Sequence, residues 1–236
     1  DNGSTDGSLE EIPGAFSTGS NLGFAAGNNV GIHRSQGKFV LLLNPDTIIY
    51  SKTIETVLAF MQAHPEVGAA TCRVELPDGS LDYSCHRSFP DPIGSFLHIV
   101  GFRHLSKYSS THIPNTIHEI DALTGAFAMI RKEAGVQVDW LDEDYFWNGE
   151  DIDFCYKLKE KGWKVIYIPS VKITHFKGLS AKATPESRRL WATDSTTAMS
   201  TFYRKHLAPK YPFFVNWAVS LGIWLLRTYR VLTNFL

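Results

Sequence analysis

The sequence predicts an α/β domain whose ligand site lies at the carboxyl ends of its strands, and three observations support this fold class. In the stretch FVLLLNPDT (39–47), the first five residues form an unbroken apolar run that stops at the turn signal Asn44-Pro45-Asp46, which is typical of a strand buried on both faces in the middle of a sheet. Further strand-like runs follow at residues 67–76 and 120–130, with helical periodicity between the first two. A chain of 236 residues is long enough for one such domain with a full core and a tail.

Composition and charge exclude several classes of protein. The apolar fraction of 44% is ordinary for a globular domain, and the net charge of −1 gives no indication of nucleic-acid binding. Cys72, Cys85 and Cys155 lack CxxC spacing, which argues against a disulfide framework or a zinc site and favours a reducing compartment. The sequence starts with neither a Met nor a signal peptide, and it begins inside what looks like a motif. We therefore expect a cytoplasmic protein with a truncated N-terminus.

The first elements are predicted from caps, turns and periodicity. Residues 1–8 are dense in loop and cap formers, a weak strand is expected at 15–18, and a helix at about 26–35. After the strand at 39–47, Ser51 is expected to cap a second helix. The apolar positions of that helix recur at i, i+3, i+4 and i+7, namely Ile54, Val57, Leu58 and Met61.

The middle of the chain alternates strands with irregular segments. A strand at residues 67–76 is followed by a turn at 77–80, from which residues 81–85 are expected to return as a hairpin. Residues 87–118 lose periodicity and contain several prolines, which predicts a long, partly helical connection. A buried strand is then expected at residues 120–130.

The second half carries a further helix and two strands. The segment Thr124-Gly125-Ala126 interrupts the predicted strand with small residues, which leave space for a ligand. Residues 142–153 are rich in acids and aromatics and lead into a helix for which Gly162 is a plausible stop. Strands are predicted at residues 164–168 and 171–174.

The C-terminal part is predicted to be helical. Residues 185–207 have an amphipathic pattern, and residues 213–226 are apolar but too few to span a bilayer, which needs about twenty residues. An interfacial helix and a helix docked on the domain are both open. The interfacial interpretation rests on side chains suited to a water–lipid boundary: Trp217, Trp224, Arg227 and Arg230.

Asp46 and the glycine-rich stretch are the first candidates for chemistry. Asp46 follows a predicted strand beside a rigid proline, at the rim of a sheet where a metal-binding carboxylate would lie. A simple turn is the alternative, because Asn, Pro and Asp are all turn residues. Residues 21–29 hold two glycines and three asparagines, which permit close backbone approach to a ligand. A glycine-rich helix entry without a ligand is equally open.

The acidic stretch and one histidine complete the candidates. Glu150, Asp151 and Asp153 lie in the first turn of a predicted helix, where acids commonly do no more than complement the helix dipole. His175 directly follows a predicted strand, and a lone histidine is more often structural than a ligand.

Several of these stretches occur together in one known family. The motifs are DNGSTDGS (1–8), NLGFAAGNNVG (21–31), LLLNPDT (41–47), PDGSL (77–81), TGAFAMIRKE (124–133), DEDYFWNGEDIDFCYKLKEKGWKVIYIP (142–169) and KITHFKG (172–178). In their order and spacing they resemble the bacterial family 2 glycosyltransferases, especially the rhamnosyltransferase-like branch.

The resemblance implies a GT-A fold, a Rossmann-like mixed sheet flanked by helices. In that family a strand, a helix and a second strand precede the DNGSTDGS position, and they are missing from this sequence. We therefore expect residues 1–180 to form an incomplete GT-A domain, residues 181–210 a helical extension, and residues 211–236 an apolar C-terminal helix.

The resemblance also implies the binding residues. Those for the nucleotide-sugar donor are Asp1, Asn2, Asn21, Gly23, Gly27, Asn28, Asn44, Asp46 and Gly125. A divalent ion, Mn²⁺ or Mg²⁺, would be held by Asp46 and His175. The family's metal motif is usually Asp-x-Asp, and Asn44 takes its first position here. Asn2 stands where many relatives have a second Asp, which leaves the nucleobase open.

The implied reaction is inverting transfer of a sugar, rhamnose in the branch resembled, from a nucleoside diphosphate to a glycan or lipid-linked glycan. Asp151 matches the family's general base, with Glu150 the second choice. The work would take place at the cytoplasmic face of a membrane, in cell-surface polysaccharide synthesis.

Two other functions stay open on the sequence alone. A catalytically inactive nucleotide-sugar or glycan-binding module is one, given Asn44 and the missing N-terminal elements. A nucleotidyltransferase is the other, but it needs a basic glycine-rich loop, and no Lys or Arg lies between Asp1 and His33.

Overall fold

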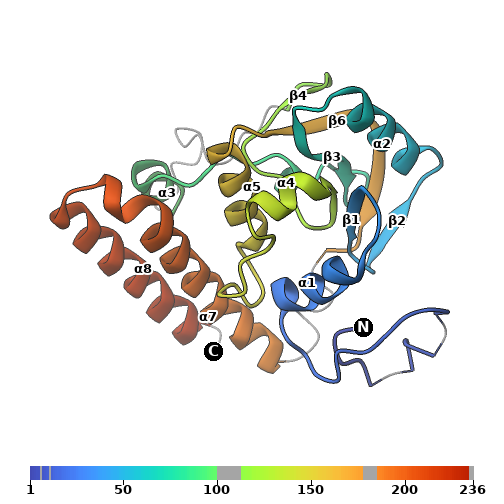
Figure 1. Cartoon of the computed structure of the whole chain (residues 1–236). Coiled ribbons are helices and arrows are strands. Elements are labelled where there is room, and N and C mark those ends of the chain that lie inside the picture. Colours follow the sequence, from blue (N-terminus) through green and yellow to red (C-terminus); the bar gives the residue numbers. More distant parts are fainter. Residues whose placement is uncertain (6, 11, 100–112, 178–184, 234–236) are drawn as a thin grey trace.

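The computed structural model describes residues 1–5, 7–10, 12–99, 113–177 and 185–233. Six strands form one mixed sheet in the order β1-β5-β3-β6-β2, with β4 pairing with β6 outside this path (Figure 1). The strands are β1 (Phe39–Leu43), β2 (Thr47–Ile49), β3 (Val67–Glu75), β4 (His118–Glu119), β5 (Phe127–Arg131) and β6 (Lys164–His175).

Helices flank this sheet. They are α1 (Phe24–Arg34), α2 (Thr53–Ala63), α3 (Pro92–Ile99), α4 (Lys132–Gln137), α5 (Glu150–Glu160), α7 (Pro185–Phe202) and α8 (Phe213–Thr233). Helix α2 packs on β3 and β6, α4 on β3 and β5, and α5 on β6. Large side chains such as Tyr145, Tyr167 and Phe127 are fully buried in the core that results. The predicted α/β class is confirmed.

Strand directions place the carboxyl ends of three strands at one edge. Strand β5 runs antiparallel to both β1 and β3, while β3 and β6 are parallel, so β1, β3 and β6 point the same way. Strand β2 turns back along β6, and Thr47 pairs with His175. The loops that follow Leu43, Glu75 and His175 therefore meet at the same edge of the sheet.

Helices α7 and α8 lie side by side as an antiparallel pair at the side of the domain away from β2 (Figure 1). A π-helical segment, Tyr203–Leu207, links them to α5. Its His206 donates from Nε2 to the fully buried Asp153 carboxylate at 2.6 Å, and Tyr145 and Lys157 also contact Asp153. No described helix has the length and apolar character needed to cross a bilayer.

The helices predicted near residues 26–35, 54–61 and 150–162 are confirmed, as is the one predicted at 185–207. Gly162, at a φ of +84°, follows α5 as expected. Ser51 is not the cap of α2, however. The N-cap is Lys52, without a side-chain bond, and Thr53 Oγ1 instead donates to Lys172 O at 2.9 Å, which fixes the start of α2 on β6.

The strand expected in residues 39–47, stopping at Asn44, is confirmed as β1, but its expected burial on both faces in the middle of the sheet was wrong. Strand β1 ends at Leu43, and among the described strands it pairs only with β5. Its side chains alternate between buried and half-buried, so a continuous apolar run did not mean burial on both faces. The turn at Asn44-Pro45-Asp46 separates it from β2.

Other strand predictions also need correction. Residues 15–18 are irregular, because their backbone hydrogen bonding with Asp1 covers too few residues to form a β-ladder. The expected hairpin at 81–85 is a single bridge, Glu75 to Leu81, followed by a 3-10 turn at Tyr83–Cys85.

The strand expected at residues 120–130 is β5 alone, after an irregular approach. The two strands expected at 164–174 are one irregular strand, β6. Of the expected connection at 87–118, residues 100–112 lie outside the described part. So do residues 178–184, where the 180/181 division was expected.

Candidate active site

The two side chains expected to hold a metal lie next to each other at the carboxyl edge of the sheet. His175 Nε2 is 3.3 Å from Asp46 Oδ1, although the residues are far apart in sequence. The backbone fixes this contact, because Thr47 pairs with His175 across β2 and β6 and Phe176 N donates to Asp46 O at 2.9 Å. The turn interpretation of Asp46 and the structural interpretation of His175 are therefore each incomplete: both residues belong to one cluster.

A second carboxylate stands behind the histidine. Asp82 Oδ2 is 3.6 Å from His175 Nδ1, and its other oxygen accepts from Lys177 Nζ at 2.8 Å. Burial alone would raise the pKa of the Asp82 carboxyl, but the contacts with His175 and Lys177 outweigh burial and hold that pKa well below its usual value.

The predicted base lies in an ion pair. Asp151 Oδ2 is 2.5 Å from Arg87 Nη2, and Gly125 N donates to the same oxygen at 3.3 Å. Arg87 also donates to Leu123 O. The Gly125 segment and the start of α5 are thereby held together, and Asp151 is fixed in orientation rather than free to rotate.

Glu150, next to Asp151, has a different environment. Its side chain is buried, and burial together with the neighbouring Asp151 charge raises its pKa well above the usual value. Asp194 of α7 contributes to the same effect, and it accepts from Asn148 Nδ2 at 2.9 Å. Burial raises the pKa of Asp194 as well. The acidic stretch therefore does more than complement the dipole of α5.

Short links connect the two clusters. Asn44 N donates to Ala126 O at 3.2 Å, which places the end of β1 beside the Gly125 segment. A side chain at Gly125 would meet the Phe24 ring at 3.1 Å, so α1 also borders this segment. Asp46, Asn44, Gly125 and Asp151 are thus connected through neighbouring segments.

The asparagine-rich loop is tied by its own side chains. Asn2 Nδ2 donates to Asn21 Oδ1 at 3.2 Å and to Gly23 O at 2.9 Å, while its Oδ1 accepts from Leu22 N and Thr18 Oγ1. These contacts use all four hydrogen-bonding positions of the Asn2 amide. In this structure Asn2 shapes the loop at residues 18–23.

The remaining predicted donor residues lie around that loop. Gly27 packs against Asn2, since a Cβ there would lie 2.9 Å from the Asn2 side chain. Asp1 Oδ2 accepts from the backbone N–H groups of Gly3 and Ser4, and Asn28 Nδ2 donates to Phe24 O within α1.

Three residues in or near this region were missed from the sequence. Asp82 follows the PDGSL motif but reads as a turn residue, and Arg87 has no motif around it. Asn29 was taken only as part of the glycine- and asparagine-rich stretch that permits close approach to a ligand, yet it is buried and donates to Leu141 O and Glu143 Oε1. The neighbouring residues in the sequence indicate only turns and loops. These side chains are buried by segments that are far away in the sequence.

Comparison with known proteins decides the family. A family model described as "Glycosyltransferase like family 2" matches residues 14–195, well over half of the chain. The chain belongs to this family. The resemblance read from its motifs is confirmed.

Relatives and folds agree with this assignment. The chain is 29% identical over 210 residues to the N-acetylglucosaminyl-diphospho-decaprenol L-rhamnosyltransferase of Mycobacterium tuberculosis, covering 79% of this chain and 68% of the relative. It is 28% identical to the rhamnosyltransferase WbbL of Escherichia coli, covering 68% and 63% of the two chains.

Solved structures show the same fold. A mannosyltransferase from Pyrobaculum calidifontis, solved with GDP-Man and Mn²⁺, has a TM-score of 0.52 at 15% identity, covering 93% of this chain and 54% of that one. GalNAc-T7, solved with UDP, GalNAc and Mn²⁺, has a TM-score of 0.52 at 13% identity, covering 80% and 38%. The expected GT-A fold is confirmed.

Asp46 and His175 are the residues that would hold the implied metal ion. Within the described part of the chain, no group of three or more His, Cys, Asp or Glu side chains is arranged to hold a metal ion. Asp46 and His175 supply one carboxylate oxygen and one imidazole nitrogen, which suit Mn²⁺, and a donor diphosphate and water would supply the remaining oxygens. The pair fits an ion that binds together with a nucleotide.

We predict that Gly23→Ala lowers the free energy of unfolding by about 1–3 kcal/mol, the usual cost of one strained backbone position. Gly23 has a φ of +86°, and a Cβ there would lie 2.6 Å from Phe146 O, the atom that accepts from Phe24 N at 2.7 Å. Urea unfolding of the two proteins measures the difference.

Gly31→Ala is the matched control within α1. A Cβ at Gly31 meets nothing within 4 Å, so alanine should raise stability by about 0.5–1 kcal/mol through helix propensity. Equal effects from both substitutions would contradict the close approach at Gly23.

Proposed function

We propose that the protein is an inverting glycosyltransferase that moves a sugar, rhamnose by analogy with its relatives, from a nucleoside diphosphate to a glycan or lipid-linked glycan. The observation that carries the proposal is the Asp46–His175 pair at the carboxyl edge of a family 2 fold, which is linked to Asp151 through Asn44 N–Ala126 O and Gly125 N. The names of the mycobacterial and E. coli relatives support the sugar, and the mycobacterial name supports a lipid-linked acceptor.

The donor would lie across the carboxyl edge of the sheet. A divalent ion bound there neutralises the charge that develops on the diphosphate leaving group. Asp46 and His175 would hold that ion, and Asn44 can donate to a ribose hydroxyl. Gly125 would let the backbone approach the donor closely between Phe24 and the start of α5, where a Cβ would already lie 3.1 Å from the Phe24 ring. Lys177, half-exposed at this edge, adds positive charge near the phosphates.

The base would act on the acceptor hydroxyl during in-line attack, which inverts the anomeric carbon. Asp151 is preferred to Glu150 for two reasons. Its side chain is 14% exposed, whereas Glu150 is buried more deeply. The raised pKa of Glu150 also favours its protonated carboxyl, which cannot accept a proton. Arg87 and Gly125 N would keep the Asp151 carboxylate aimed at the acceptor.

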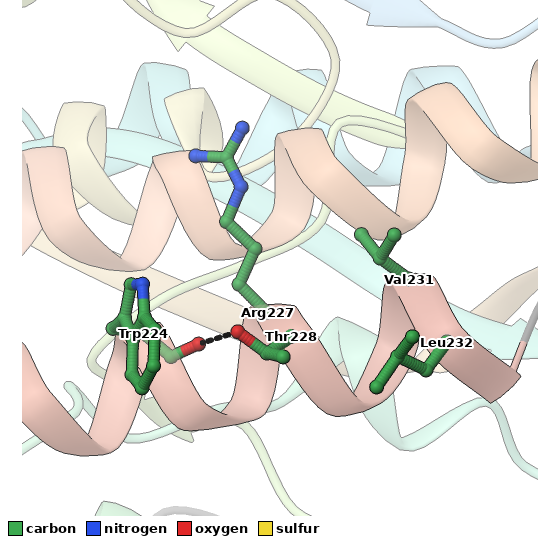
Figure 2. A pocket seen from close by; sticks show the side chains of 5 residues that line it. All are labelled: Trp224, Arg227, Thr228, Val231 and Leu232. Atoms are coloured by element: carbon green, nitrogen blue, oxygen red, sulfur yellow. Dashed lines mark hydrogen bonds between the residues drawn. The ribbon is translucent and has the colours of Figure 1, made fainter.

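The place of work would be the cytoplasmic face of a membrane, with α8 in the interface. Its exposed side chains are large and mostly aromatic: Phe213, Phe214, Trp217, Leu221, Trp224, Leu225, Tyr229 and Leu232. Figure 2 shows Trp224 and Leu232 along the outer side of α8, on either side of Arg227 and Thr228. Aromatic side chains favour the water–lipid boundary.

One part of the membrane expectation was wrong. Arg230 Nη1 donates to Ser195 Oγ of α7 at 2.6 Å, so this side chain faces the helix pair and not a headgroup. Arg227 is exposed and remains suited to an anionic surface. Helix α8 is therefore docked on α7 through one face while its apolar face stays open to solvent.

We predict that Asp46→Asn abolishes the Mn²⁺-dependent stabilisation of the protein by UDP or dTDP. A nucleotide at a thousand times its dissociation constant stabilises by about 4 kcal/mol, which a thermal-shift titration detects easily. Asp144→Asn, an exposed carboxylate paired with Lys205, is the control and should leave the shift intact. A normal Mn²⁺-dependent shift in Asp46→Asn would exclude Asp46 from the donor site.

We predict that Asp151→Asn leaves nucleotide affinity intact and cuts turnover by about 10²–10⁴-fold, the usual effect of losing a general base. Donor turnover with a lipid-linked glycan is the measurement. Collapse of nucleotide affinity would instead mean that Asp151 belongs to the donor site. Donor binding without any wild-type turnover would favour the inactive binding module.

Glu150→Gln is the companion variant. The raised pKa means that the folded state binds more protons than the unfolded state above pH 4.5, so stability falls as the pH rises toward that pKa. Glutamine removes this loss and should make the variant more stable than wild type at neutral pH, with turnover reduced less than in Asp151→Asn. The opposite order of turnover would exchange the two roles.

We predict that the protein floats with anionic liposomes at low salt and that Trp217→Ser/Trp224→Ser floats several-fold less, because each removes a large exposed aromatic from α8. Val136→Ser is the control, since Val136 on α4 is 61% exposed, comparable to Trp217 at 68% and Trp224 at 60%. Absence of wild-type flotation, or dimers that disappear in the tryptophan variant, would instead assign the apolar face to another occupant.

A further inference from the structure

Three side chains at the edge of the sheet form a row. Asp82 Oδ2 lies 3.6 Å from His175 Nδ1, and His175 Nε2 lies 3.3 Å from Asp46 Oδ1. Asp82 and His175 are buried, while the Asp46 side chain is 20% exposed. Within the described structure, neither Asp82 Oδ2 nor His175 Nδ1 has a hydrogen-bond partner inside 3.5 Å, so these two buried atoms face each other.

The Asp82 carboxylate is held in place from its other side. Its Oδ1 accepts from Lys177 Nζ at 2.8 Å and from Ser84 N at 3.0 Å. Its backbone N donates to Val74 O at 2.9 Å, which anchors the residue to the end of β3. Both groups that contact Oδ1 are donors, so an acceptor atom must stay at that position. The Asp82 carboxylate is therefore held in one orientation, with Oδ2 directed at His175.

A neutral imidazole has one N–H, so it can donate to only one of the two carboxylates. If the proton were on Nε2, a buried Asp82 oxygen would face the Nδ1 lone pair with no water to solvate it, which is costly. With the proton on Nδ1, the N–H points at that oxygen, 3.6 Å away, and the opposite charges attract. The Nε2 lone pair then faces Asp46, which is accessible to water or to a cation.

We propose that Asp82 is the positioning residue that fixes the Nδ1–H tautomer of His175 and so presents the Nε2 lone pair, beside Asp46, to a divalent ion. The metal-binding part of this role rests on the proposed function. The tautomer of His175 does not, because it is a property of the metal-free protein. Carboxylates behind metal-binding histidines work in this way, and losing one typically weakens metal affinity by about 10–100-fold.

Asp82→Asn tests the role without a large change in volume. Lys177 and Ser84 N need an acceptor, so the new amide should keep its oxygen toward them and turn its NH₂ toward His175. That NH₂ would donate to Nδ1, move the imidazole proton to Nε2 and thereby block the metal-binding lone pair. Asp78→Asn is the matched control, because Asp78 lies in the preceding turn, is exposed and, among the described residues, bonds to Ser80.

The first measurement is long-range ¹H–¹⁵N NMR of the metal-free protein at pH 8, with His175→Gln used to assign the signals. We expect the Nδ1–H tautomer in wild type and Asp78→Asn, and the Nε2–H tautomer in Asp82→Asn. The second is Mn²⁺ affinity by electron paramagnetic resonance in the presence of UDP, where Asp82→Asn should be about 10–100-fold weaker.

Two results would overturn the proposal: an Nε2–H tautomer in wild type, or Asp82→Asn with the wild-type tautomer and Mn²⁺ affinity. If Asp82→Asn does not fold, Asp82→Ala replaces it and should leave the proton shared between both nitrogens; a pure Nδ1–H tautomer there would count against Asp82. Failure of wild type to bind Mn²⁺ with UDP would contradict the proposed function, whereas the NMR measurement would still decide the role of Asp82.

Discussion

The shared direction of β1, β3 and β6 is the constraint on which the candidate site depends. Because β5 runs antiparallel between β1 and β3, and β3 pairs in parallel with β6, all three strands end at one edge. The chain segments after them carry Asp46, Asp82 and, at the end of β6, His175. These residues are widely separated in sequence, and the strand order is what places His175 within 4 Å of both Asp46 and Asp82. A reversal of any one of these strands would disperse them.

The sequence indicated those candidate site residues that neighbouring residues in the chain mark out. Asp46 was found because an apolar strand stops at a proline turn, and His175 because it ends a strand and fits a family motif. Asp82 and Arg87 were missed, since their importance comes from burial under distant segments and from contacts with His175 and Asp151. Local sequence around Asp82 indicates only a turn, which it also forms through Ser84.

The fold shows the same division between local and distant information. Helices with regular apolar spacing, such as α2, were predicted well, because periodicity is set within the helix itself. The predicted position of β1 in the sheet was wrong because an apolar run indicates a strand but not its place in the sheet, and three of its five residues are only half-buried. The sequence predicted two strands separated at Pro169. The structure has one strand there, β6, whose register against β3 is irregular but not broken.

Partly buried polar contacts connect the C-terminal helices to α5 and to the loop before it, which carry the candidate residues Glu150 and Asp151. Asp153, one turn from the start of α5, holds His206 of the π-helical segment, and Asn148 beside Glu150 holds Asp194 of α7. The loop that precedes Asp151 is therefore packed between the sheet edge and the helix pair whose outer face is apolar. An acceptor held at a membrane by its lipid would reach Asp151 from this side, while the nucleotide would enter from the edge that carries Asp46.

We propose that Asp46 and His175 form one metal and nucleotide site at the edge of the sheet. A crystal structure of the protein with UDP and Mn²⁺ tests this site, because the anomalous scattering of manganese locates the ion. We expect one peak within about 2.5 Å of both Asp46 and His175 Nε2, in contact with the diphosphate. A bound nucleotide whose manganese peak lies among Glu150, Asp151 and Asp194, out of reach of Asp46, would contradict it.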